Sequence, residues 1–195
     1  ARILVLPHAE LARTDIADPA LMALRDSNIQ EVCLLARRGV LQAAFTPKEL
    51  EQLIALDNLD LIIEPQDLEL DAASEAELAK PEFSEARQNL ELLRKVAERP
   101  RSGSSETKST KAKRIRFMFL TSPQSIREDG DSKRLHTARN TLQRGDDGRV
   151  RAIASGETSS LEVGLIINAT GYQGTPIEGL PFDQQRGVIR NEASR

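Results

Sequence analysis

Cysteine and aromatic residues are scarce in this sequence. Its 195 residues include one cysteine, Cys33, no tryptophan, one tyrosine and five phenylalanines. A single cysteine excludes an internal disulfide framework and is compatible with a reducing compartment. The sequence also lacks any run approaching the roughly 20 apolar residues of a membrane span, and no secretory signal is visible. We therefore expect a soluble, intracellular protein without a membrane span.

A surplus of charge and several catalytic motifs are missing as well. The net charge is −3 and the pI is about 5.6, so the whole chain has no general attraction for nucleic acid or anionic membranes. Gly-x-Ser-x-Gly, Walker and His-Glu-x-x-His patterns are absent, which leaves hydrolase chemistry without support. His8 and His136 have no second histidine or cysteine at metal-ligand spacing, so we expect no metal site.

The stretch 101–114 differs in composition from the rest of the chain. It is rich in Ser, Thr, Lys and Gly, and its basic residues are opposed only by Glu106. Such a composition predicts a mobile, solvated basic loop. Binding of single-stranded nucleic acid uses aromatic side chains interleaved with basic ones, and this stretch has none. No nucleic-acid partner is predicted.

The first part of the sequence alternates between helical and strand patterns. Residues 1–6 resemble the tail of a helix, and Asp18-Pro19 supplies an N-cap and a first-position proline for a helix ending near residue 27. A strand is predicted over 31–36 and another over 59–63. Between them, Thr46-Pro-Lys-Glu49 is a capping box that opens a helix through Ile54. This rhythm predicts an α/β fold with a parallel sheet and covering helices.

The second part predicts a further helix and a group of strands. Residues 67–80 are acidic with little periodic signal, whereas a helix should begin at Ser84 and end before Pro100. Strands are predicted over 115–120, within 135–142 and over 149–154, the last after a turn at 145–148. Together they are predicted to form a small antiparallel β insert spanning 115–154. The continuous apolar run 163–168 predicts a central strand covered on both faces.

Two adjacent arginines, Arg37 and Arg38, follow the predicted strand 31–36. In a dinucleotide-binding βαβ unit this position lies beside the adenosine ribose, where an acidic residue holds a free 2′-hydroxyl and arginine accepts a 2′-phosphate. Two guanidinium groups, each contributing roughly 1.5–3 kcal/mol, would favour NADP over NAD by about a hundred-fold or more. The alternative is an ordinary solvated surface pair.

Longer motifs carry a resemblance to a known family. The segment Ala36-Arg-Arg-Gly-Val-Leu-Gln-Ala-Ala-Phe-Thr-Pro-Lys-Glu-Leu50 is similar to the NADP domain of adrenodoxin reductase and its bacterial ferredoxin–NADP reductase relatives. Further similar elements follow in the same order, among them Arg116-Phe-Met-Phe-Leu-Thr-Ser-Pro-Gln124 and Asn168-Ala-Thr-Gly-Tyr172. The resemblance implies that residues 1–195 are a fragment of the Rossmann-like NADP-binding domain of a two-domain FAD/NAD(P) flavoprotein. In the family pattern a Gly-x-Gly-x-x-Ala turn precedes Ala1, so the first βα unit is expected to be truncated, and Thr-Gly-Trp follows Arg195.

The resemblance also implies a function. NADPH reduces FAD, and the flavin passes electrons singly to a ferredoxin or adrenodoxin-like iron–sulfur protein; the fragment alone would be inactive. Arg37 and Arg38 would bind the 2′-phosphate, and Glu49 would make a further NADP contact, although its capping box explains it equally well. Ala169-Thr-Gly171 would lead back to the FAD domain, where the flavin site mostly lies. No residue of the chain is predicted to be catalytic.

Two other functions are compatible with the sequence. One is a glutamate-synthase small-subunit-like flavoprotein, which a cysteine-rich N-terminal region would favour. The other is a non-catalytic NADP-sensing or interaction module that keeps the arginine pair without a flavin. The family resemblance places the protein in the cytoplasm, or in the mitochondrial matrix of a eukaryote.

Overall fold

The computed structural model describes the chain except for residues 100–112, 131, 147–148, 172 and 192–195. It divides into a large unit, Ala1–Glu162, and a small one, Val163–Arg195. Most of the predicted basic loop, residues 101–112, lies outside the described residues. Lys113 and Arg114, which the prediction included in the loop, belong to a strand.

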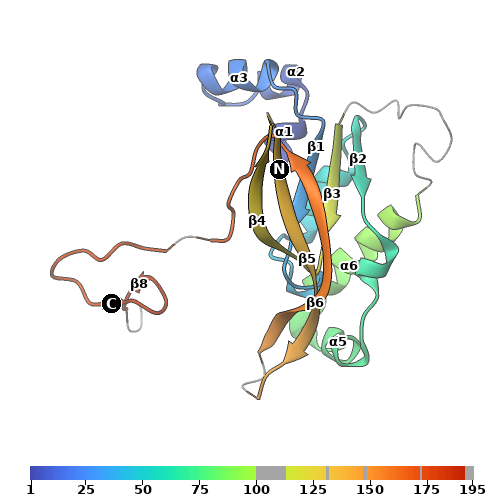
Figure 1. Cartoon of the computed structure of the whole chain (residues 1–195), viewed down its shortest axis with the longest axis vertical. Coiled ribbons are helices and arrows are strands. Elements are labelled where there is room, and N and C mark those ends of the chain that lie inside the picture. The colour runs from blue at the N-terminus through green and yellow to red at the C-terminus, as the bar shows by residue number, and fades with distance from the viewer. Residues whose placement is uncertain (100–112, 131, 147–148, 172, 192–195) are drawn as a thin grey trace. The chain divides into compact units, whose positions relative to one another are not determined.

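A three-stranded parallel sheet forms the centre of the large unit (Figure 1). Its strands are β1 (Glu31–Leu35), β3 (Lys113–Met118) and β2 (Leu59–Ile62), in the order β1-β3-β2. Ile115 of β3 pairs with Val32 on one side and with Leu61 on the other. The predicted parallel sheet and its strands 31–36 and 59–63 are therefore confirmed.

The prediction that 115–120 is the first strand of the antiparallel insert is wrong. The strand is the middle one of the parallel sheet, and it ends at Met118. Alternating burial, with Ile115 and Phe117 inward, suits either kind of sheet. The sheet is parallel because β3 pairs with β2 and β1, whose residues lie about 50 and 80 positions earlier in the chain. Local patterning does not reveal such distant pairing.

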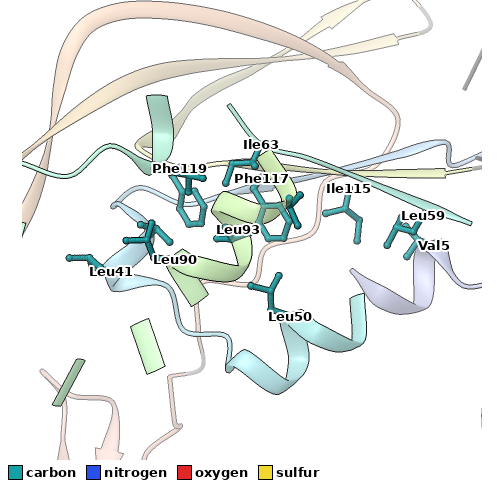
Figure 2. Close-up of a cluster of buried hydrophobic side chains, with 13 residues drawn as sticks. Val5, Leu41, Leu50, Leu59, Ile63, Leu90, Leu93, Ile115, Phe117 and Phe119 are labelled. Atoms are coloured by element: carbon teal, nitrogen blue, oxygen red, sulfur yellow. The ribbon is translucent and has the colours of Figure 1, made fainter. Parts of the chain in front are cut away.

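Helices cover one face of this sheet and enclose an apolar core. The covering helices are α4 (Pro47–Ile54) and α6 (Ser84–Ala97), both starting where the sequence predicts. Figure 2 shows Leu90 and Leu93 of α6 facing Phe117 of β3 and Phe119, which follows that strand. Leu93 is fully buried, and burying such a side chain contributes roughly 1.5–3 kcal/mol.

The remaining helices of the large unit are short. α1 (Arg2–Val5) confirms the helical tail, and it is followed by α2 (His8–Leu11) and α3 (Asp18–Arg25). Asp18 was expected to cap α3, but Ala17 occupies the cap and Asp18 lies in the first turn. In the acidic stretch, where the sequence showed little periodicity, the chain forms the 3-10 turn η2 (Pro65–Leu68) and helix α5 (Ala72–Leu78). Two further 3-10 turns are η1 (Val40–Gln42) and η3 (Pro81–Phe83).

An antiparallel sheet follows the parallel one in the chain. Its strands, β4 (Thr121–Asp129), β5 (Ser132–Arg144) and β6 (Val150–Val163), are arranged in sequence order (Figure 1). The predicted strand 135–142 lies within β5, and the predicted strand 149–154 lies within β6 except for Arg149. β4 was missed because it is polar and contains Pro123. The β4–β5 register shifts between Pro123 and Ser125, an irregularity that accommodates a residue without an N–H donor.

The small unit corrects one prediction. The run 163–168 is not a central strand: β6 ends at Val163, and Leu165 and Ile167 are 58% and 63% exposed. A continuous apolar run predicts coverage on both faces, yet coverage requires neighbouring strands, which the described residues of this chain do not supply. The unit contains the two-stranded sheet of β7 (Phe182–Asp183) and β8 (Val188–Ile189).

Candidate functional site

The carboxyl edge of the parallel sheet is where an α/β fold of this kind places its ligands. Arg37 and Arg38 follow β1, the turn η2 follows β2, and Phe119 with Leu120 follows β3. Both arginine residues are exposed. The predicted position of the pair, just past a parallel strand, is therefore the position that the structure shows.

The backbone of the arginine loop, residues 36–39, is held by the segment that joins the two sheets. The carbonyl of Ala36 accepts a hydrogen bond from the N–H of Thr121 at 3.0 Å, and that of Arg38 accepts one from Leu120 at 3.2 Å. Between them, the carbonyl of Arg37 accepts from the side-chain Nδ2 of Asn140 at 2.9 Å. Three successive carbonyl groups are thus paired with the antiparallel sheet or with the residue that leads into it, and both arginine residues are exposed on this fixed main chain.

The far end of the loop is anchored as well. Gln42 accepts a hydrogen bond from the N–H of Gly39 through Oε1 at 3.1 Å and returns one from its own N–H to the Gly39 carbonyl, also at 3.1 Å. Val40 and Leu41 of η1 are buried in the core. The arginine side chains therefore project from a loop that is tied to the antiparallel sheet at its start and to the core at its end.

Leu120 connects β3 to β4 through an unusual backbone conformation. Its φ is +52°, a left-handed conformation that costs an ordinary L-residue on the order of 1–2 kcal/mol. This turn directs the Leu120 N–H at Arg38 and the Leu120 carbonyl at the N–H of Asn140, 2.7 Å away. Strain of this kind persists where surrounding contacts over-determine it, and here those contacts are the ones that hold the arginine loop.

Glu49 occupies the third position of α4 and completes the predicted capping box. Its Oε2 accepts from the Thr46 N–H at 2.7 Å and from the Thr46 hydroxyl at 2.9 Å, and the Glu49 N–H donates to that hydroxyl at 3.3 Å. The backbone hydrogen bond from Thr46, with the hydroxyl bond after it, lowers the pKa of the Glu49 carboxyl. The cap accounts for one carboxylate oxygen, and the proposed NADP contact would use the other.

An ion pair that sequence reasoning missed lies beside the loop. Asp67 of η2 is 5% exposed, and its Oδ1 is 2.6 Å from Nη1 of Arg139 in β5. Burial raises the pKa of Asp67, and the hydrogen bond and charge of Arg139 counteract that shift only in part. Asp67 begins the acidic stretch for which no element was predicted, whereas Arg139 lies in a predicted strand about 70 positions later. One acidic and one basic residue so far apart gave no signal that they pair.

A cavity of about 420 Å³ adjoins these residues. Its lining includes Gly39 and Leu41 from the arginine loop and η1, Asp67, and Arg139 and Asn140 of β5. Asn140, which holds the arginine loop, therefore also lines the adjoining cavity.

Three further features concern metal binding, thiol reactivity and membrane insertion. Within the described residues, no group of three or more His, Cys, Asp or Glu side chains is arranged to hold a metal ion. Burial, together with nearby Glu31, raises the pKa of the Cys33 thiol, which lowers the thiolate fraction and hence its reactivity. Among the described residues, the helices are all too short or too polar to span a bilayer.

The architecture is that of a mixed α/β protein, and a solved structure shares it. The structure of Mycobacterium tuberculosis FprA in complex with NADPH superposes with a TM-score of 0.85 and 42% identity, over the whole of this chain and 40% of that chain. No family model matches the sequence.

Sequence comparison with curated proteins identifies the kind of protein more narrowly than the shared architecture does. The chain is 42% identical over 200 aligned residues to NADPH-ferredoxin reductase FprA of Mycobacterium tuberculosis, and 36% identical over 201 to the mitochondrial NADPH:adrenodoxin oxidoreductase of Arabidopsis thaliana. All of this chain is aligned, but it spans only 41% and 40% of those relatives. The chain is therefore homologous to a part of these reductases, and the resemblance stated from its motifs is confirmed.

Proposed function

We propose that this chain supplies the NADP-binding part of an NADPH-dependent ferredoxin or adrenodoxin reductase. The observation that carries the proposal is the arginine loop: two exposed guanidinium groups follow a parallel strand on a backbone fixed at Ala36, Arg37 and Arg38. A pair of planar cations is suited to a dianionic 2′-phosphate, which NADPH carries and NADH lacks. Homology to proteins named as NADPH-dependent reductases points to the same cofactor.

We also propose a more specific fold than the mixed α/β class. Residues 1–195 would be an incomplete Rossmann-like domain whose first βα unit is truncated, with the antiparallel sheet as an insert. The parallel order β1-β3-β2, with α4 and α6 on the core side, supports this interpretation. A helix N-terminus beyond this chain would then receive the pyrophosphate.

The residues of this chain would bind and orient the cofactor and leave the electron chemistry to it. NADPH supplies a hydride when bound, and a reductase of this type uses FAD to pass single electrons to an iron–sulfur protein. Arg37 and Arg38 would hold the 2′-phosphate. Glu49 would accept a ribose hydroxyl through Oε1, since Oε2 is engaged with Thr46.

The small unit would connect this domain to the flavin-binding part. The exposed run Leu165–Ile167 has the apolar composition of a buried strand, and Gly171 adopts a φ of +111° that favours glycine. We propose that this segment is covered by the remainder of the full-length protein.

The single cysteine is consistent with a reducing compartment, the cytoplasm or the mitochondrial matrix.

Steady-state kinetics of the full-length protein test this function. Replacing Arg37 and Arg38 together by alanine should lower kcat/KM for NADPH by about a hundred-fold, mainly through KM, and leave that for NADH nearly unchanged. Arg127→Ala is the matched control, because this exposed arginine lies on β4 roughly 20 Å along the strand from Thr121. Equal losses with both nucleotides in the double variant would refute the 2′-phosphate assignment.

A further inference from the structure

Asn140 is a buried polar residue in an otherwise largely exposed sheet. It lies in β5, is 4% exposed, and is 103 residues from Arg37 in the sequence. Its Nδ2 donates to the Arg37 carbonyl at 2.9 Å and to Oγ of Ser122 at 2.8 Å. Its backbone N–H donates to the carbonyl of the strained Leu120 at 2.7 Å.

These contacts require the chemistry of a carboxamide. One Nδ2 group provides two donors, and both have an acceptor here, one on the arginine loop and one on β4. An aspartate of the same shape would turn a carboxylate oxygen toward the Arg37 carbonyl, which can only accept, although the Ser122 hydroxyl could rotate and donate to it. A leucine of similar size would leave the Arg37 carbonyl without its side-chain donor.

The hydrogen bond acts on the peptide between the two arginines. The Arg37 carbonyl and the Arg38 N–H belong to one planar peptide group, so fixing that carbonyl fixes the rotation of the whole group. This rotation sets the directions in which the two Cα–Cβ bonds leave the main chain. Asn140 therefore constrains how the Arg37 and Arg38 guanidinium groups are placed relative to each other.

We infer that Asn140 is a positioning residue for the nucleotide: by holding the Arg37 carbonyl, it aligns the arginine pair and makes preference for a 2′-phosphate depend on the antiparallel sheet. This inference rests on the proposed function of Arg37 and Arg38. It adds a residue that acts through the Arg37 carbonyl, and a contribution from β5 to the selectivity of a loop that follows β1.

The experiment uses Asn140→Asp and Asn140→Leu in the full-length, flavin-loaded protein. Each should lower kcat/KM for NADPH about ten-fold through KM, because the arginines remain and lose only their alignment, while kcat and the NADH values stay close to those of the parent. Titration calorimetry gives a second readout. Adenosine 2′,5′-bisphosphate should bind about ten-fold more weakly, and adenosine 5′-monophosphate should bind as before.

Two variants separate positioning from general damage. Thr137→Val alters another buried side chain of β5, whose hydroxyl contacts Ser159 rather than the arginine loop, and it should leave the NADPH to NADH ratio unchanged. Ser122→Ala removes only the second acceptor of Nδ2 and should change the ratio less than the Asn140 variants do. Flavin content and the midpoint of thermal unfolding verify that each protein is folded. If Asn140→Leu does not fold, the nucleotide preference of the nearly isosteric Asn140→Asp variant tests the inference instead.

A double-mutant cycle completes the test. In the protein that already lacks Arg37 and Arg38, Asn140→Leu should have no further effect on nucleotide preference. If the arginine variant alone leaves the preference intact, the proposed function fails and the inference fails with it. If the arginines matter but the Asn140 variants keep the parent ratio, or weaken both probes equally, the inference alone is overturned.

Discussion

The two sheets of the large unit bury different kinds of side chain. The core around the parallel sheet is mainly apolar, with Leu50, Leu93 and Ile115 among its fully buried members and Asn89 of α6 as a buried polar exception. Among the described residues, its apolar cluster extends no further along the chain than Phe119. The antiparallel sheet buries Thr121, Thr137 and Asn140 alongside Leu135 and Ala138. Apolar burial provides most of the free energy of folding, whereas paired polar groups specify geometry. We therefore expect changes in the first region to alter stability and changes in the second to alter nucleotide selectivity.

The largest effect is expected in the apolar core. Leu93→Ala should lower the free energy of unfolding by roughly 3 kcal/mol, because Leu93 is 0% exposed and its loss leaves a cavity between α6 and β3. Urea denaturation of the full-length protein measures this change, with exposed Glu91→Ala on the same helix as control. The folded protein should keep its NADPH to NADH preference. A lost preference at full flavin content would mean that the core also shapes the site.

The second largest effect is expected for a substitution at Leu120, which joins the two sheets. Leu120→Ile conserves volume, a change that usually costs less than about 1.5 kcal/mol. At φ +52° a β-branched side chain is a genuine outlier, so we expect a loss nearer 2 kcal/mol and a weaker preference for NADPH. Leu142→Ile, in β5, is the control with the same change of side chain. Equal stability of the two variants would show that the Leu120 conformation carries no strain.

A smaller effect distinguishes the two roles of Glu49. Thr46→Ala removes the hydroxyl from the capping box and should lower the free energy of unfolding by about 1 kcal/mol with little change in either KM. Glu49→Gln keeps a residue that suits the box, yet it should raise the KM values for NADPH and NADH by a few-fold if the carboxylate accepts a ribose hydroxyl. Unchanged KM values for Glu49→Gln would leave Glu49 as a helix cap only.

The smallest effect is a dependence on pH at the boundary between the regions. The folded protein raises the pKa of Asp67 above its ordinary value of 3.8, so the folded state binds this proton more tightly than the unfolded state does. The resulting stability is fully present below the ordinary pKa and is lost as the pH rises through the raised one. From about pH 4 upward, the stability of the parent protein should therefore fall relative to that of Asp67→Asn.

A contrasting group in the parallel sheet gives the opposite sign. Burial opposes ionisation of Glu31, but Arg116 at 2.7 Å and Arg114 at 3.1 Å outweigh it and lower the pKa of Glu31. Its contribution to stability is present above the ordinary pKa and is lost as the pH falls through the lowered one. Glu31→Gln should therefore lose its disadvantage in acid, whereas Asp67→Asn gains its advantage toward neutral pH. The same slope for both variants would contradict these assignments.

Much of the fold could be predicted from local patterns. Apolar runs located β1 and β2, the Thr46 capping box located α4, and apolar periodicity located α6. These signals work because they depend on residues within a few positions of one another. The antiparallel sheet was recognised only in part, since the polar residues of β4 and its Pro123 do not resemble a strand.

From the sequence alone, two guanidinium groups are expected after the end of a parallel strand, where their chemistry suits a phosphate. The folded chain adds that β3 lies between β1 and β2, and that Leu120 and Asn140 hold the backbone of Arg37 and Arg38. These contacts could not be predicted because they join residues that are far apart in the sequence. A hydrogen bond between residues 103 positions apart leaves no local periodicity, and it forms only when both sheets have folded around it.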